Sequence, residues 1–342
     1  MNPLERRRLG RTEVTVTPMG LGGAPLGDLF EVIPEPQGEA TILTALDAGI
    51  GYVDTAPWYG RGRSEHRFGH VLSSIPRERF VISTKVGRIL RRPSSLPFSA
   101  DRWVGGLPFE VEFDYSYDGI MRSYEDSLQR LGLPRVDILL IHDLEPNYFP
   151  DPADMNSHLD ALDRGGGMKA LLELKAAGEI GAIGAGVNLE GTISRYLDRQ
   201  FPLDAFLVAM PYTLLDQPVL DKEFPICAER GIGIVIGAVF ASGILATGSK
   251  PGALWHYQPA AEPVLQKVAK IEAVCARHDV PLRAAALQFP LLHPIVAAII
   301  PGANRPSMVH ENLALLRHAI PPAFWAELKA EKLLHPDAPV AV

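Results

Sequence analysis

The most constraining feature of the sequence is a repeated alternation of short apolar runs with segments of helical periodicity. The apolar runs, such as residues 136–142, are continuous rather than alternating, as expected for parallel strands that are buried on both faces. Between them lie amphipathic segments such as residues 118–131, where apolar positions recur every three or four residues until a glycine stops the pattern. Parallel strands need crossover helices of this kind, so the pattern predicts an α/β protein.

Eight such units follow one another without a break in composition, which predicts a single (β/α)8 TIM barrel domain over residues 1–342, with an ordered core at 3–336. A doubly wound sheet is the alternative, and it is disfavoured because no G-x-G-x-x-G sequence opens a helix after the first strand. A short β-hairpin with its turn at Gly10 is expected to precede the first strand. The expected strand ends are Gly22, Asp54, Lys85, His142, Asn188, Met210, Ala238 and Pro301. The expected helices span residues 38–49, 64–73, 117–131, 164–178, 190–199, 218–230, 262–278, 283–293, 307–316 and 322–334.

Three successive predicted strands end on residues that can carry chemistry, namely Asp54, Lys85 and His142. Taken singly, an aspartate at a strand end is more often a turn former, a lysine a surface cation, and a histidine a core or loop residue. A barrel, however, brings the ends of its strands to one face. Tyr59 follows Asp54 on the next loop. We therefore expect these four side chains to share one site.

Tyr59 is the group in this set that can exchange a proton with a substrate oxygen. An isolated tyrosine has a pKa of about 10, which is too high for good acid–base catalysis near neutrality. An ammonium group favours the phenolate, so Lys85 is expected to lower the pKa of Tyr59, while Asp54 keeps Lys85 charged and oriented. His142 is placed to hydrogen-bond a substrate oxygen. The set contains no metal-ligand cluster and no strong nucleophile, so hydride transfer with a cofactor is the expected chemistry.

Three long connections follow strand ends, at residues 87–116, 143–163 and 239–261, and each carries proline, glycine and aromatic residues. Loops of this length in a compact domain are usually functional, so we expect them to wall a pocket. Flat aromatic side chains suit the C–H face of a sugar or a pyridine ring, although their alternative role is to pack the loops together. The expected substrate contacts are Trp58, Tyr59, Trp103, His142 and Trp255.

The two ends of the chain carry weaker predictions. The glycine cluster at residues 20–23 lies at a strand end, where it allows either a tight turn or close approach of a ligand. The helix expected at 307–316 begins directly behind a strand end, so its amino terminus is a candidate anion site. The tail after Pro336 is expected to be loose.

The composition bounds the partners and the compartment. The chain of 342 residues has a net charge of −7 and lacks long basic runs, which argues against nucleic acid as a partner. Its two cysteines fit a reducing compartment. The amino terminus lacks the apolar core of a signal peptide, and no run approaches the ~18 apolar residues of a membrane span. We therefore expect a cytoplasmic enzyme with a small-molecule substrate, and its oligomeric state stays open.

Several motifs together resemble the aldo-keto reductase superfamily over nearly the whole chain. They lie at residues 9–12, 19–22, 54–60, 83–85, 139–143, 184–188 and 300–303. The resemblance implies a TIM barrel that binds a nicotinamide dinucleotide without a Rossmann unit. It also implies a catalytic tetrad of Asp54, Tyr59, Lys85 and His142, in which Tyr59 is the acid–base group.

The same resemblance implies where the cofactor lies. Asn188 would face the nicotinamide carboxamide and Tyr212 the nicotinamide ring. The chain departs from the family at residues 208–210, where Val-Ala-Met replaces a region that often supplies a glutamine to the carboxamide. The implied cofactor contacts are Gly22, Gly23, Asp54, Asn188, Tyr212, Gly243, Leu245, Gly302, Asn304, Met308, Glu311 and Asn312.

The choice between NAD and NADP is expected to depend on the segment after the last strand. NADPH-using aldo-keto reductases typically have a lysine straight after the proline of this segment and an arginine six residues further on. This chain has Gly302 and Met308 there, and the charge of Glu311 disfavours an added phosphate, so NAD is expected to be preferred. Arg305 is the one cation nearby in the sequence, and it leaves NADP as a second cofactor.

Residues 113–118 and 212–217 resemble one branch of the superfamily, which contains D-threo-aldose 1-dehydrogenases (L-fucose dehydrogenases) and pyridoxal 4-dehydrogenases. Both oxidise a hemiacetal carbon to a lactone, starting from an aldose such as L-fucose or D-arabinose, or from pyridoxal to give 4-pyridoxolactone. A general carbonyl reductase is a less favoured alternative.

Two other classes of protein compete with a dehydrogenase. The first is a Schiff-base aldolase that uses Lys85, and the sequence contexts of Tyr59 and Gly302 argue against it. The second is a non-catalytic subunit that binds the cofactor, and the complete tetrad argues against that.

Overall fold

The computed structural model describes residues 2–96, 98–99 and 101–340, and its centre is an eight-stranded parallel sheet. The strands are hydrogen-bonded in the order β14-β11-β10-β9-β8-β5-β4-β3. Isolated bridges from Met19 to Ile299 and from Gly22 to Gly302 join the two edges, so the sheet closes into the predicted (β/α)8 barrel. The barrel strands are β3 (Leu21–Gly22), β4 (Tyr52–Asp54), β5 (Val81–Val86), β8 (Ile138–His142), β9 (Ala182–Val187), β10 (Ala205–Ala209), β11 (Gly233–Gly237) and β14 (Val296–Ile299).

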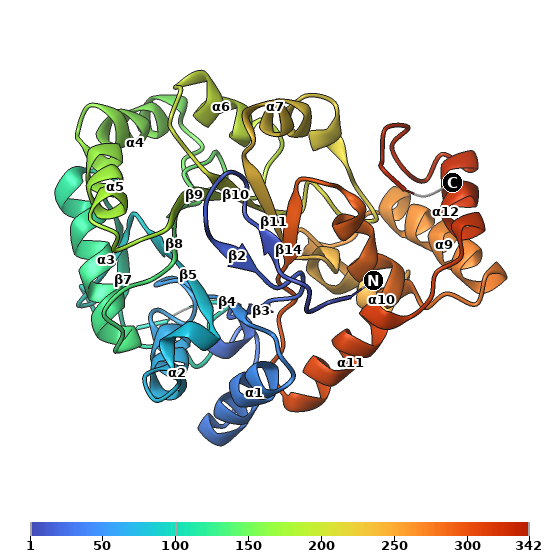
Figure 1. Cartoon of the computed structure of the whole chain (residues 1–342), viewed down its shortest axis with the longest axis horizontal. Helices are drawn as coiled ribbons and strands as arrows, with labels where there is room; N and C mark the ends of the chain where they lie inside the picture. The colour runs from blue at the N-terminus through green and yellow to red at the C-terminus, as the bar shows by residue number, and fades with distance from the viewer. Residues whose placement is uncertain (1, 97, 100, 341–342) are drawn as a thin grey trace.

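Helices surround the barrel on its outside, as Figure 1 shows. The helix with the clearest end signals is α3, because the side chain of Ser116 accepts a hydrogen bond from the Gly119 amide and Gly132, at a φ of 61°, ends it. The helices are α1 (Glu35–Asp47), α2 (Arg63–Leu72), α3 (Tyr117–Leu131), α4 (Pro152–Asp163), α5 (Gly167–Ala176), α6 (Thr192–Asp198), α7 (Glu223–Arg230), α8 (Ile244–Thr247), α9 (Glu262–Arg277), α10 (Leu282–Gln288), α11 (Pro306–Arg317) and α12 (Pro322–Ala330).

The predicted strand ends all lie within two residues of the observed ones, and every predicted helix is present with its ends shifted by a few residues. Two predicted helices are divided. The one at 218–230 consists of a 3-10 turn, Pro218–Leu220, followed by α7, and the one at 283–293 consists of α10 and the 3-10 turn Phe289–Leu292.

The three long connections contain more regular structure than the sequence predicts. Two of them hold antiparallel hairpins, and all three carry residues that reach the carboxyl end of the barrel. The prediction of plain loops was therefore wrong. The additional elements are β6 (Arg88–Arg91) with β7 (Glu110–Phe113), α4, α8, and β12 (Leu254–Trp255) with β13 (Gln258–Pro259).

Helix α4 and the carboxyl-terminal tail are the other differences. Helix α4 begins where the Asp151 side chain accepts a hydrogen bond from the Ala153 amide at 2.9 Å, and Pro152 occupies its first position. The tail after Pro336 is not loose, because Ala338 and Val340 are buried in the main hydrophobic core. The ordered core therefore continues beyond residue 336.

The predicted amino-terminal hairpin, β1 (Arg7–Arg8) with β2 (Thr15–Val16), crosses one end of the barrel in Figure 1. Its residues Leu9 and Val16 join the hydrophobic cluster that fills the barrel interior. A Cβ atom at Gly10 would lie 2.7 Å from the Gly233 amide nitrogen, and the φ of 55° also favours glycine. This close packing covers the amino end of the barrel and leaves the carboxyl end for a ligand.

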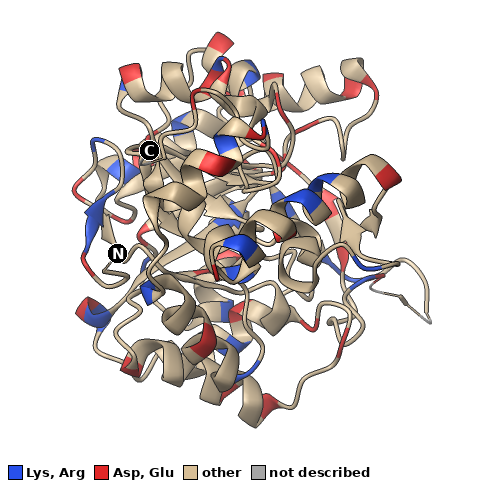
Figure 2. Ribbon diagram, turned by 90° about the vertical axis from the view of Figure 1, so that its right-hand side faces the viewer, with Lys and Arg blue, Asp and Glu red and all other residues tan. Residues whose placement is uncertain are grey.

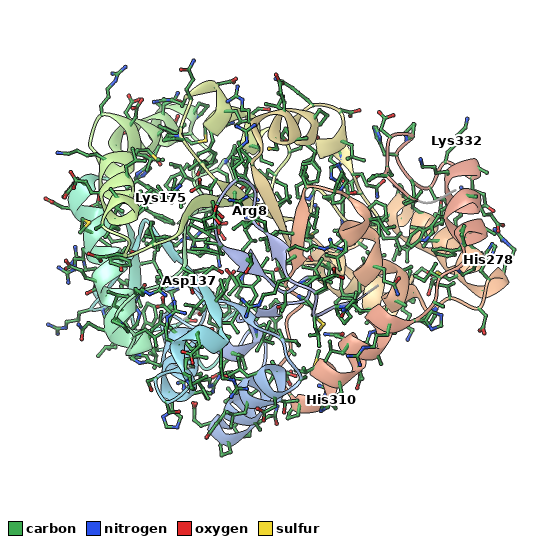
Figure 3. The ribbon with its side chains drawn as sticks, viewed as in Figure 1. Arg8, Asp137, Lys175, His278, His310 and Lys332 are labelled. Carbon is green, nitrogen blue, oxygen red and sulfur yellow. The ribbon has the colours of Figure 1, made fainter. Side chains whose placement is uncertain are left out.

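Two carboxylates connect elements near the amino end. Asp137, directly before β8, accepts a backbone hydrogen bond from β5 at 2.8 Å and pairs with Arg77 at 2.6 Å. Asp204, directly before β10, accepts one from β9 at 2.8 Å and pairs with Lys175 at 2.7 Å. Figure 3 labels Asp137, Lys175 and the hairpin residue Arg8 in this part of the molecule. These pairs fix one strand against its neighbour.

Charged residues of both signs are dispersed over the helices on the face shown in Figure 2, in keeping with the modest net charge of −7. Within the described residues, no helix has the length and apolarity that crossing a membrane requires.

Candidate active site

A pocket opens at the carboxyl end of the barrel, where the strand ends and the loops that follow them meet. Every barrel strand, or the segment directly after it, contributes to its wall. This is the arrangement that a (β/α)8 barrel provides for residues that are far apart in the sequence. The predicted site residues that line it are Gly22, Gly23, Asp54, Trp58, Tyr59, Lys85, Trp103, His142, Asn188 and Gly302.

The Lys85 ammonium group lies at the centre of the polar contacts. Its Nζ atom lies 3.1 Å from the Tyr59 hydroxyl oxygen and donates to the two Asp54 carboxylate oxygens at 2.9 and 3.1 Å. Ser83 Oγ donates to Asp54 at 2.7 Å. The Tyr59 backbone amide donates to the Ala56 carbonyl at 3.1 Å, and this turn directs the chain back over the end of β4. The fold thus holds a buried cation against the phenol oxygen.

Burial raises the pKa of Tyr59 well above its ordinary value of about 10, and the carboxylates of Asp54 and Asp143 raise it further. The Lys85 ammonium acts in the opposite direction, but it does not outweigh burial. The expected net lowering of the pKa of Tyr59 was therefore wrong. Burial likewise raises the pKa of Asp54, against the attraction of Lys85. Near neutrality Tyr59 is a neutral phenol that can donate a proton.

His142 is held as a neutral imidazole. Burial, and then the charges of Arg88 and Lys85, keep its pKa well below the usual value. Its Nε2 atom lies 3.3 Å from the Asp143 carboxylate, and Nδ1 is buried without a partner among the described residues. The ring lies edge-on to Tyr59, with centroids 6.0 Å apart. A neutral imidazole can orient a substrate oxygen beside the Tyr59 hydroxyl without adding charge.

Two of the three predicted tryptophans wall the pocket. Trp58 and Trp103 lie edge-on to each other at 5.9 Å, and Trp103 is 5.7 Å from the Tyr59 ring. Both rings therefore border the space beside the Tyr59 hydroxyl.

Trp255 does not line this pocket, because it packs against the main core, and Tyr257 contributes to the lining instead. His256 and Tyr257 form the two-residue turn between β12 and β13, with φ values of 50° and 59°. This left-handed turn, which usually requires glycine or asparagine, presents Tyr257 to the pocket. The sequence offers no asparagine–glycine signal for it.

Tyr212 does not line the pocket, so its predicted contact with the nicotinamide ring is not supported. It is fully buried, with its ring 4.8 Å from Phe224 and 5.2 Å from Phe289. Met210 has a φ of 82°, which turns the chain just beyond β10. The wall at β10 is formed by the side chains of Leu207 and Ala209.

Asn188 lies directly after β9 in a fixed orientation. Its Nδ2 atom donates to Asp143 at 2.9 Å and to Glu145 at 2.7 Å, while its backbone amide donates to Glu145 at 2.8 Å. Burial and the neighbouring Asp143 raise the pKa of Glu145 to about 7. Because both amide hydrogens are used, Asn188 presents its oxygen to a ligand, the complement of a carboxamide NH2 group.

The remaining predicted cofactor residues lie outside the pocket lining, on and next to α8 and α11. Gly243 has a φ of 103°, and no heavy atom lies within 4 Å of where its Cβ would be. The amides of Gly243 and Leu245 both donate to the Phe240 carbonyl, and the Leu245 side chain is buried. The Asn304 side chain donates to Glu31, so these groups already have partners within the chain.

The residues of α11 gather around a cation that the sequence did not indicate. Arg283, on α10, donates to Glu311 at 3.1 Å and to the Asn312 side-chain oxygen at 3.3 Å. The Asn312 Nδ2 atom is buried without a partner among the described residues. Met308 lies half-buried on the first turn of α11. Arg305 is thus not the one cation near this segment.

These features fit a nicotinamide dinucleotide. Asn188 offers an acceptor in the pocket, and Asn312 offers an unpartnered donor on α11. Gly22 and Gly302 also line the pocket, and the backbone packs closely there, because a Cβ atom at either position would lie 2.6 Å from Ile300 or Pro25.

The predicted site residues did not include the other charged and tyrosine residues of the lining, namely Arg102, Asp143, Tyr148 and Tyr257. Asp143 could have been found, because it directly follows His142 and the rule that strand ends carry chemistry extends to it. The other three lie on loops, where the sequence does not determine the direction of a side chain.

Comparisons with known proteins identify the family of the chain. The chain is 43% identical over 340 residues to a pyridoxal 4-dehydrogenase of Microbacterium luteolum, covering 96% of this chain and 98% of that one. It is 37% identical to a D-threo-aldose 1-dehydrogenase of a Pseudomonas species, covering 94% and 95%.

Among solved structures, an aldo-keto reductase of Bacillus halodurans in its holo form superposes with a TM-score of 0.73. The identity is 24%, and the match covers 98% of this chain and 99% of that one, so it bears on the fold. The sequence profile of the Aldo/keto reductase family matches residues 18–332. The chain therefore belongs to the aldo/keto reductase family and is an NAD(P)-dependent oxidoreductase.

Proposed function

We propose that this protein oxidises the hydroxyl group of a cyclic hemiacetal to a lactone and prefers NAD as the hydride acceptor. The observation that carries the proposal is the Tyr59 hydroxyl, 3.1 Å from the buried Lys85 ammonium and beside a neutral His142. A hemiacetal hydroxyl that loses its proton while its carbon loses a hydride becomes the carbonyl of a lactone. At that oxygen, Tyr59 can exchange the proton and His142 can form a hydrogen bond, while the hydride passes from the carbon to the cofactor.

In this proposal Tyr59, as the phenolate, accepts the proton of the reacting hydroxyl. Lys85 stabilises the phenolate, and Asp54 holds Lys85 in place. His142 donates a hydrogen bond to the same substrate oxygen and sets its direction. The nicotinamide, when bound, supplies the acceptor for the hydride. Asn188 would hold the carboxamide, and the backbone at Gly22 and Gly302 would lie along the dinucleotide towards Asn312.

The favoured substrate is the lactol form of an aldose such as L-fucose or D-arabinose. Similarity to the D-threo-aldose 1-dehydrogenase supports it, as do the polar residues Arg102 and Asp143 in the pocket wall. Pyridoxal is the second candidate, supported by the 43% identity to the pyridoxal 4-dehydrogenase and by the flat rings of Trp58 and Trp103. Both form the cyclic hemiacetal that the reaction requires.

The preference for NAD is supported by the residues of α11. Gly302 and Met308 offer no cation to a 2′-phosphate, and Glu311 would repel it. Arg283 pairs with Glu311 at 3.1 Å and reduces that repulsion. The proposal is therefore a preference for NAD and not an exclusion of NADP.

A spectrophotometric screen tests this function. Purified protein is mixed with L-fucose, D-arabinose or pyridoxal and with NAD or NADP, and formation of the reduced nicotinamide is followed. Reduction of NAD with one of these hemiacetals is the expected result. If none reacts, the proposal fails, and borohydride trapping of Lys85 with a carbonyl compound in the absence of nucleotide would then favour an aldolase.

A further inference from the structure

Behind the pocket wall lies a buried arginine that the proposed reaction leaves unused. Arg88 follows β5 closely, and its side chain is 1% exposed. Its Nη2 atom donates to the Asp143 carboxylate at 2.7 Å, and Asp143 is its one salt-bridge partner among the described residues. The guanidinium group also lies over the rings of Tyr148 at 4.2 Å and Trp58 at 5.0 Å. Arg88 is thus fixed from several sides.

Such a pair is a poor device for stability alone. Removing two charges from water costs several kcal/mol per ion, and well-packed apolar residues often replace a buried pair without loss. Asp143 also adopts a left-handed backbone conformation, with a φ of 47°. Strain of this kind in a residue other than glycine is common where function requires a particular side-chain position. The pair therefore calls for a functional explanation.

The Asp143 carboxylate lies in the pocket wall between two groups of the proposed machinery. One carboxylate oxygen accepts a hydrogen bond from the Asn188 side-chain amide at 2.9 Å. The other oxygen lies 3.3 Å from His142 Nε2. An ionised carboxylate has about four acceptor positions and no donor. Asn188 and Arg88 occupy two of these positions, and Asp143 borders the pocket. The remaining acceptor positions can take a hydrogen bond from a substrate hydroxyl.

We propose that Asp143 is a specificity-determining residue that accepts a hydrogen bond from the hydroxyl nearest to the reacting one. In a sugar lactol this is the 2-hydroxyl, and in pyridoxal it is the 3-hydroxyl. Arg88 holds the Asp143 carboxylate in position from behind. This inference rests on the proposed function, since it names the feature by which that site selects among hemiacetals. A site built to bind a hydroxyl discriminates strongly against an analogue without it, because the buried acceptor is then unpaired.

A different role for Asp143 predicts different results. If the carboxylate only orients His142 or Asn188, it assists every substrate equally. If it binds a substrate hydroxyl, its removal affects only substrates that carry that hydroxyl. The comparison of a substrate with its deoxy analogue therefore separates the two roles.

The test uses two matched pairs, D-arabinose with 2-deoxy-D-ribose and pyridoxal with 3-deoxypyridoxal, at saturating NAD. We expect the wild-type kcat/KM to be at least ~10²-fold higher for the hydroxylated member of the pair that reacts. Asp143→Asn should reduce this ratio to within about three-fold, mainly by slowing the hydroxylated substrate. The double variant Arg88→Met with Asp143→Asn should do the same. Because the double variant removes both charges, it leaves no buried arginine without a counter-ion, so it serves as the test if Asp143→Asn alone does not fold.

Asp137→Asn, which changes the same residue type at the other end of the barrel, is the control and should keep the wild-type ratio. Equal wild-type rates within a pair would overturn the role of Asp143 and leave the proposed function intact. So would a variant that slows both members of a pair equally. If no member of either pair reduces NAD and none binds the NADH-loaded wild-type enzyme in calorimetry, both the function and this inference fail.

Discussion

The two ends of the barrel both carry pairs of an aspartate and a cation, but the pairs differ in exposure and in what surrounds them. At the amino end, Asp137 pairs with Arg77 and Asp204 with Lys175, and these cations are 22% and 35% exposed. At the carboxyl end, Asp54 pairs with Lys85 and Asp143 with Arg88, and the cations are 2% and 1% exposed. The cations of the amino-end pairs are therefore partly exposed to solvent, whereas those of the carboxyl-end pairs are buried.

The surroundings explain the difference. Each amino-end carboxylate also accepts a backbone amide of a neighbouring strand, so it acts on the arrangement of the sheet. The carboxyl-end carboxylates instead border the pocket and hold side chains that face a ligand. The same chemical pair therefore stabilises strand order at one end and prepares a reactive group at the other. Matched substitutions at the two ends should separate these roles.

The largest contrast is expected between Lys85→Met and Lys175→Met. We expect the first to lower kcat by at least ~10³-fold, because Tyr59 loses the cation that stabilises its phenolate. It should also reduce stability by about 3–5 kcal/mol, since Asp54 is left buried without a counter-ion. The second should cost at most about 1 kcal/mol and leave kcat unchanged, because Lys175 is partly exposed. Steady-state kinetics and urea denaturation measure both.

The dependence of kcat on pH should also differ between the wild type and Lys85→Met. Oxidation needs Tyr59 as a base, and burial raises its pKa, so the rate should rise with pH on the alkaline side. Loss of the Lys85 charge destabilises the phenolate and should move this rise to still higher pH. A Lys85→Met enzyme with the wild-type kcat and pH profile would contradict the role given to the pair.

The next largest effect concerns Tyr59, whose hydroxyl lies next to the buried Lys85–Asp54 pair. Tyr59→Phe should lower kcat by at least ~10²-fold, in the range of general acid–base contributions, with little change in NADH affinity. Tyr117→Phe on α3, where the hydroxyl contacts the exposed Glu173, is the matched control and should be neutral. Kinetics and NADH fluorescence titration give both quantities. Near-normal turnover of the Tyr59 variant would remove this residue from the mechanism.

A smaller effect is expected when an amino-end pair is broken. Asp137→Asn retains the shape but loses the charge that pairs with Arg77 and accepts a backbone amide of β5. We expect a loss of about 2 kcal/mol in the free energy of unfolding, typical for hydrogen bonds to a charged group. kcat at ordinary temperature should not change. A large loss of activity in a folded variant would show that the amino-end pair also affects catalysis and does not act on stability alone.

Residues on regular elements were predictable from the sequence. Strand ends follow from continuous apolar runs, and α3 follows from a serine cap, helical spacing and a terminal glycine. Helix α4 was missed although Met155, Leu159 and Leu162 recur at helical spacing. Its Asp-Pro start lies within a connection whose proline and aromatic residues favoured a loop. Local cap chemistry was the better guide there.

The candidate site divides in the same way. Asp54, Lys85 and His142 lie on strand ends, and the barrel alone brings them together. Tyr212 and Trp255 lie beyond strand ends, on segments whose direction depends on single backbone angles. The left-handed conformations at Met210 and at the 256–257 turn could not be predicted from residue types that usually avoid them.

The smallest effect concerns an exposed pair between α10 and α11, Arg283 with Glu311, whose side chains are 31% and 47% exposed. We expect the wild-type kcat/KM to be at least ~10-fold higher with NAD than with NADP, a difference of about 1.4 kcal/mol. The sequence suggests replacing Gly302 with lysine, but a Cβ atom there would lie 2.6 Å from Pro25. Met308→Arg is therefore the better test, because it avoids this clash. It places a cation on the first turn of α11 and should narrow the preference several-fold.

Arg283→Met is the counterpart of this variant, because it frees the Glu311 charge and should widen the preference for NAD. Arg283 belongs to the exposed pair, and Met308 lies three residues before Glu311 on the same helix, so kcat with saturating NAD should stay within about two-fold of wild type. This would distinguish the exposed pair from the buried pairs, where we expect loss of a charge to lower kcat strongly at Lys85 and to change substrate selection at Asp143. A wild-type preference for NADP would instead assign the 2′-phosphate to Arg283 or Arg305. Initial rates with both cofactors across the three enzymes decide between these outcomes.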